Sequence, residues 1–168
     1  DVVDPISDIT VYYGDPDQII ALFDVFEDAI DADTDLTYTI VGNSDPTVVT
    51  PSAISSTDGL LTLNFGAGGT SLITIKVENL AGGFVTEIFM VEVEKYPLTV
   101  RADAKTKTYG AINPELTITY EGFVDGDDEA DLDIPPNVYT FADEASDVGN
   151  YTIYVTNGGD DKYQYLYV

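Results

Sequence analysis

Apolar and polar side chains alternate with a period of two along most of this chain, and that pattern constrains its fold more than any other feature. Successive side chains of a β-strand point to opposite faces, so such a run buries one face and exposes the other. The clearest runs cover residues 9–13, 61–65, 73–78 and 85–94. We therefore predict an all-β protein.

One segment, residues 18–30, could pass for a helix, because Phe23, Phe26 and Ile30 lie three and four positions apart. The pattern between these residues is weak. We expect mostly strand and loop there, so the segment does not change the all-β prediction.

The strand pattern stops near residues 95–97 and then starts again, which indicates two domains. Strands that recur every 8–12 residues or so, with turn residues between them, are typical of β-sandwiches. We predict two tandem immunoglobulin-like β-sandwiches, residues 1–96 and 97–168. The second is short for a stable core, so we expect support from a neighbouring domain or from a last strand beyond residue 168.

The chain is strongly acidic, with 31 Asp and Glu against 6 Lys and Arg and a formal net charge of −25. Nucleic-acid binding needs basic residues that neutralise phosphates, so this class of function is excluded. Docking onto anionic membranes is disfavoured for the same reason. The acids are spread over both predicted domains, and their mutual repulsion would be relieved by bound divalent cations.

The chain has no cysteine and no histidine. These absences exclude disulfides, cysteine nucleophiles, Ser-His-Asp triads and metal sites with Cys or His ligands. No stretch approaches the 18 or so apolar residues of a membrane-spanning helix, so we expect no membrane insertion. Because the sequence opens with Asp1 and shows no signal peptide, we expect it to be a piece of a longer protein.

The predicted first domain resembles cadherin-like or dystroglycan-type modules of bacterial surface proteins. The resemblance lies in residues 6–15, in residues 22–44 with their D-A-D-T-D-L-T-Y core, and in residues 71–83. It implies an immunoglobulin-like sandwich. Ala29, Ile30 and Thr34 depart slightly from the usual pattern of these modules.

The predicted second domain is similar to the MBG repeats of large bacterial surface proteins. The matching stretches are Y-P-L-T-V-R-A-D-A-K-T-K-T-Y-G at 96–110, N-P-E-L-T-I-T-Y-E-G-F-V-D-G-D at 113–127, and V-G-N-Y-T-I-Y-V at 148–155. Such modules occur in tandem arrays in secreted or cell-surface adhesins, often of Bacteroidota. The resemblance therefore implies an extracellular or cell-surface location.

Asp28, Asp31, Asp33 and Asp35 form an acidic cluster at the start of a predicted strand. Calcium prefers oxygen ligands and takes six to eight of them, so these carboxylates are candidate ligands for Ca²⁺, with carbonyls, water, Asp24 or Glu27 completing the set. The alternative is a solvated acidic loop. The spacing of an EF-hand, with glycine at position six and glutamate at position twelve, is absent.

A second acidic run covers residues 125–133, and we expect it to be a hydrated connector rather than a cation site.

Asp147, Gly149 and Tyr151 match the D-x-G-x-Y pattern before the sixth strand of immunoglobulin-like folds. We expect the Tyr151 hydroxyl to bond back to nearby backbone, forming a tyrosine corner.

Tyr163, Tyr165 and Tyr167 lie on one face of the last predicted strand. Such a stripe could stack on carbohydrate, but we favour one face of a terminal strand that is partly covered by the next repeat. Paired carboxylates could also serve a glycoside hydrolase. The chain lacks the length and insertions that build a deep cleft, so we expect no catalysis.

Our interpretation is a non-catalytic fragment of a large extracellular bacterial protein, acting as a spacer and adhesion module with calcium as a stabilising ion. The expected partners are neighbouring repeats of the parent protein and a cell-surface protein or glycan, and we expect a monomer. The alternative is a carbohydrate-binding accessory module that uses exposed tyrosines.

Overall fold

The computed structural model describes residues 1–168 and contains strands and three short 3₁₀ turns, with no α-helix. The prediction of an all-β fold is confirmed. The chain divides into two compact units, unit 1 (Asp1–Glu94) and unit 2 (Lys95–Val168). No helix is long and apolar enough to cross a membrane.

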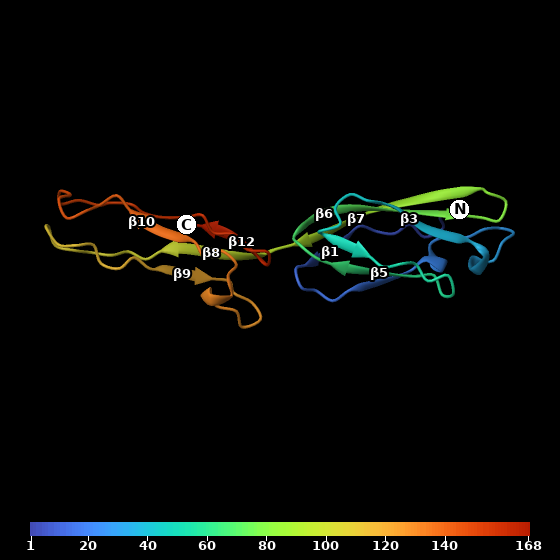
Figure 1. The fold of residues 1–168 in the computed structure, drawn as a ribbon, viewed down its shortest axis with the longest axis horizontal. Helices are drawn as coiled ribbons and strands as arrows, with labels where there is room; N and C mark the ends of the chain where they lie inside the picture. Colours follow the sequence, from blue (N-terminus) through green and yellow to red (C-terminus); the bar gives the residue numbers. More distant parts are fainter. The chain divides into compact units, whose positions relative to one another are not determined.

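Unit 1 contains two sheets (Figure 1). The four-stranded sheet has the order β1-β7-β6-β3, and the three-stranded sheet has the order β2-β5-β4. The bounds are β1 Ile9–Tyr12, β2 Gln18–Ala21, β3 Thr37–Asn43, β4 Val49–Pro51, β5 Leu60–Phe65, β6 Gly69–Glu78 and β7 Phe84–Glu94. β1 runs parallel to β7, and the other paired strands are antiparallel.

One hydrophobic core joins the two sheets of unit 1. The apolar residues of the alternating runs form this core. Leu61 and Leu63 of β5 and Ile73 and Ile75 of β6 are fully buried. Phe26 is also buried, although it follows β2 and the 3₁₀ turn η1 (Leu22–Asp24) rather than lying in a helix. The expectation of strand and loop at 18–30 is therefore confirmed.

Unit 2 contains a three-stranded sheet, β12-β8-β9, and a separate antiparallel pair, β10-β11. The bounds are β8 Tyr96–Ala102, β9 Ile118–Glu121, β10 Asn137–Thr140, β11 Ile153–Thr156 and β12 Tyr163–Tyr167, with the 3₁₀ turn η3 at Glu129–Asp131. Its core is smaller than that of unit 1. The buried hydrophobic residues of this core are Leu98, Val100, Leu132, Tyr163 and Tyr165.

The two units share one arrangement of their end strands. In unit 1 the first strand, β1, pairs in parallel with the last, β7, with Ile9 opposite Val91. In unit 2 the first strand, β8, pairs in parallel with the last, β12, with Tyr96 opposite Tyr163. Each unit therefore begins and ends on neighbouring strands that point the same way.

Candidate functional site

The predicted calcium ligands lie in the loop before β3, and two of them hold that loop in place. Asp28 Oδ1 accepts hydrogen bonds from the backbone N–H of Ile30 (2.9 Å) and Asp31 (3.0 Å), and Oδ2 accepts one from Asn79 (3.2 Å). Asp31 Oδ2 accepts the N–H of Leu80 at 3.1 Å. The bonds from Asp31, Ile30 and Asn79 lower the pKa of Asp28, because they favour the charged carboxylate. The loop is thus tied to the β6–β7 turn.

The other two predicted ligands, Asp33 and Asp35, lie in the 3₁₀ turn η2 (Asp33–Asp35). The structure brings no three acidic side chains together in a group that could hold a metal ion. In this arrangement the four carboxylates do not fit the six to eight oxygens that calcium requires. Calcium binding at this loop would need a rearrangement, and it stays a prediction.

Two aspartates of the second acidic run, Asp125 and Asp127, pair with a lysine from a distant part of the chain. The Lys162 ammonium lies 3.0 Å from Asp125 Oδ2 and 2.8 Å from Asp127 Oδ2. The Tyr163 hydroxyl donates to the same Asp127 oxygen at 2.7 Å and accepts the N–H of Val124 at 3.0 Å. This part of the run is therefore bonded to β12 and its preceding residue, whereas the sequence predicted a hydrated connector.

We expect these contacts to make unit 2 sensitive to acid. The bonds from Lys162 and Tyr163 lower the pKa of Asp127. A lowered carboxylate pKa stabilises the folded state in full above the unfolded value of about 4, and the contribution is lost as the pH falls through the folded value. We expect the urea midpoint of unit 2 to fall less steeply in Asp127→Asn than in the native chain between about pH 5 and pH 2. Identical acid profiles would contradict this role of Asp127.

The tyrosine stripe of β12 belongs mainly to the core. Tyr163 and Tyr165 are 3% and 9% exposed, and only Tyr167 is open to solvent, at 44%. The sugar-stacking alternative is wrong for Tyr163 and Tyr165. Cover by the next repeat, which the sequence predicted, is not what buries Tyr163 and Tyr165: unit 2 itself covers them, since they pack with Leu98, Val100 and Leu132.

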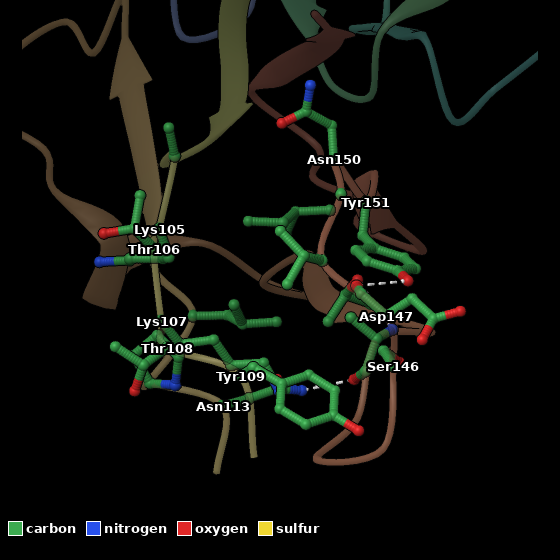
Figure 2. Close-up of a pocket in the computed structure, with 18 residues that line it drawn as sticks. Lys105, Thr106, Lys107, Thr108, Tyr109, Asn113, Ser146, Asp147, Asn150 and Tyr151 are labelled. Atoms are coloured by element: carbon green, nitrogen blue, oxygen red, sulfur yellow. Dashed lines mark hydrogen bonds between the residues drawn. The ribbon is translucent and has the colours of Figure 1, made fainter. Parts of the chain in front are cut away.

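A groove in unit 2, with a volume of about 380 Å³, is the best candidate for a functional site. Figure 2 shows that residues 105–109 form one wall and residues 146–151 form the facing wall. The apolar part of the lining consists of Ala104, Pro114, Leu116, Ala142, Val148, Gly149 and Ile153. The polar part consists of Lys105, Thr106, Lys107, Thr108, Tyr109, Asn113, Thr140, Ser146, Asp147, Asn150 and Tyr151.

Four hydrogen bonds fix the two walls. The Lys107 ammonium donates to the carbonyls of Ala111 (3.0 Å) and Asp143 (2.6 Å). Asn113 Nδ2 donates to the carbonyl of Ala142 at 2.6 Å. The Tyr151 hydroxyl donates to the carbonyl of Asp147 at 2.9 Å (Figure 2). This last bond confirms the predicted tyrosine corner, which here shapes a groove wall.

The groove and the core of unit 2 lie within one stretch that matches a protein-family model. Residues 98–168 match the family model of the MBG domain (YGX type). Within this MBG domain, Tyr109, Gly110 and Ala111 are the one Tyr-Gly-X sequence, and Tyr109 lines the groove. The predicted resemblance of the second half to MBG repeats is confirmed. No curated protein matches the chain, and the cadherin-like character of unit 1 stays a prediction.

Several polar side chains in the groove of the MBG domain have no partner within the protein. Lys105, Thr106, Thr108, Tyr109 and Asn150 make no side-chain hydrogen bond or ion pair. None of these five residues was predicted from the sequence as a site residue. Lys and Thr alternate over residues 105–108, but nothing in the sequence indicates that residues 146–151 lie opposite this segment.

Proposed function

We propose that this chain is a non-catalytic, load-bearing spacer segment of a large bacterial surface or secreted protein. The MBG match in unit 2 supports the surface location, since this repeat family is typical of surface proteins. Neighbouring repeats of the same parent protein are the proposed partners. The strong negative charge supports a monomer, because two copies repel each other.

The parallel pairing of the end strands carries this proposal. Tension on a spacer pulls the first strand of a unit at its N-terminal end and the last strand at its C-terminal end. In a parallel pair these are opposite ends, so the strands must slide along each other. The interstrand hydrogen bonds of β1–β7 and of β8–β12 are then loaded together rather than broken one after another. This geometry resists force in both units.

Single-molecule force spectroscopy tests the load-bearing role. When the chain is pulled between its two ends, we expect unit 1 to unfold at a higher force than when it is pulled between handles at Thr70→Cys and Glu94→Cys. The second geometry separates the paired ends of the antiparallel β6–β7 hairpin, where Thr70 lies opposite Glu92, so its bonds break one at a time. The chain has no native cysteine, so both handles are unique.

Equal unfolding forces in the two pulling geometries would contradict the load-bearing role. The unfolding force is set by the barrier along the pulled direction, so equilibrium stability cannot account for a difference between two directions in one protein. The comparison therefore serves as its own control.

The calcium hypothesis for Asp28, Asp31, Asp33 and Asp35 has a separate test. If calcium binds there, we expect the melting temperature of unit 1 to be higher in millimolar calcium than in a buffer that contains a chelator. A ligand that binds only the folded state stabilises that state. Magnesium at the same ionic strength controls for general screening of the acidic surface. The rise should disappear in the double variant Asp33→Asn, Asp35→Asn. An equal rise of the melting temperature with both ions would contradict a specific calcium site. The loop would then be held by the hydrogen bonds of Asp28 and Asp31 alone.

A further inference from the structure

We propose that the groove of the MBG domain binds a short, uncharged glycan of one or two pyranose rings. This inference goes beyond the spacer role, because it gives the segment a ligand of its own. It rests on the shape of the groove, on the aromatic rings in its two walls, and on its unpartnered polar groups.

The size of the groove suits a small ligand. Its volume of about 380 Å³ lies at the lower end of the range of roughly 300–1,000 Å³ for small-molecule sites. Its lining combines an apolar part, including Leu116 and Ile153, with polar groups on both walls. Such a mixture is typical of ligand sites, in which apolar surface gives contact area and a few polar groups give orientation.

Each wall contributes an exposed tyrosine. Tyr109 is 69% exposed and Tyr151 is 47% exposed, and Figure 2 shows them coming from the two facing segments. The face of an aromatic ring carries partial negative charge, which attracts the partly positive C–H groups on the face of a sugar ring. The Tyr151 ring is already held by its bond to the Asp147 carbonyl, so contact with a ligand costs little ordering of that side chain.

The unpartnered groups suit a polyol. A sugar hydroxyl both donates and accepts hydrogen bonds, and the groove offers both kinds of partner. Lys105 donates, the Asp147 carboxylate accepts, and Thr106, Thr108 and Asn150 do both. None of these side chains makes a hydrogen bond or an ion pair with another group of the protein, and Lys105 interacts with Asp103 through its charge alone.

The charge of the groove and of the whole chain favours an uncharged glycan over a polyanionic glycan or a second copy of the chain. The groove is lined by two ammonium groups and one carboxylate, with Asp143 and Glu144 close by. The Lys107 ammonium is already bonded to two carbonyls, whereas the Lys105 ammonium makes no hydrogen bond and interacts with Asp103 through its charge alone. The net charge of −25 repels polyanionic glycans and a second copy of the chain, but does not oppose a neutral sugar.

A second exposed aromatic surface provides the matched control. Tyr139, Phe141 and Tyr154 form a cluster outside the groove, whereas Thr140 and Ile153 of the same hairpin line the groove. The Tyr139 and Tyr154 rings are stacked with centroids 5.3 Å apart, and Phe141 lies 5.6 Å from each. These rings cover part of each other's faces, so the groove is the better site for a sugar.

The test uses the whole chain on an array of neutral, uronic-acid-containing and sialylated oligosaccharides, followed by calorimetric titration of the best neutral ligand. We expect Tyr109→Ala and Asn150→Ala to weaken binding by about tenfold or more, which corresponds to 1.4 kcal/mol or more. Phe141→Ala should leave the affinity within about twofold. Tyr109, Asn150 and Phe141 are exposed, and unchanged melting temperatures will show that the three variants are folded.

Three results would overturn the proposal: no neutral glycan bound on the array, binding of acidic glycans alone, or loss of binding in Phe141→Ala with binding kept in Tyr109→Ala. The last result would place the sugar on the outer aromatic cluster. None of these results bears on the pulling experiment, so the glycan site and the spacer role can fail independently.

Discussion

Replacing Leu98 with alanine is expected to lower the free energy of unfolding of the MBG domain by about 2–5 kcal/mol. Leu98 is fully buried in the central strand β8, and the core around it has few other buried side chains. Truncation removes apolar contact and leaves a cavity, because close-packed neighbours relax only in part. For a unit as small as Lys95–Val168, whose whole stability is roughly 4–11 kcal/mol, this loss is a large fraction.

Hydrogen exchange read by mass spectrometry measures this effect, because peptides from the two units report separately. The matched control is Leu166→Ala in β12, where the side chain is 46% exposed and the expected loss is below about 0.5 kcal/mol. Equal losses in the two variants would show that Leu98 is not central to the core. Faster exchange in unit 1 peptides as well would contradict the assignment of Leu98 to the core of unit 2 alone.

The second large effect is expected at Gly122, just after β9. Its φ is +119°, and a Cβ built there lies 2.6 Å from the Pro97 carbonyl oxygen. The clash is with a backbone atom of the central strand β8. A backbone atom cannot move away by a change of rotamer, as a side chain can. Gly122→Ala therefore combines the strain of a positive φ, about 1–2 kcal/mol, with overpacking of about 1–3 kcal/mol.

Gly126 separates these two causes. Its φ is +88°, but a Cβ there meets nothing within 4 Å. Gly126→Ala should cost the conformational part alone, so the urea midpoint of Gly122→Ala should lie clearly below that of Gly126→Ala. Equal midpoints for the two variants would refute the close approach of Gly122 to Pro97.

The strands were predictable because their alternation is a local property. Residues 61–65 and 73–77 place every second side chain in the core, as their sequence indicates. The order of the strands was not predictable. The parallel pairs β1–β7 and β8–β12 join residues far apart in the chain, and no local pattern specifies that β8 lies beside β12 rather than beside another strand.

For the sites too, features set by nearby residues were predictable and features that join distant residues were not. The tyrosine corner at Tyr151 was predictable, because donor and acceptor lie four residues apart and the D-x-G-x-Y pattern marks them. The pairing of Lys162 with Asp125 and Asp127 was not, since more than thirty residues separate the partners. The groove depends on two distant segments, 104–116 and 146–153, so no single stretch of sequence revealed it.

The ammonium of Lys162 has a consequence for where such a segment can work. It lies within 3.0 Å of carboxylate oxygens of two aspartates and neutralises part of their charge. Because this counter-charge is part of the chain, it cannot be diluted into the medium or removed by a chelator. The loop around Asp125 and Asp127 therefore keeps its counter-charge in media that are poor in divalent ions.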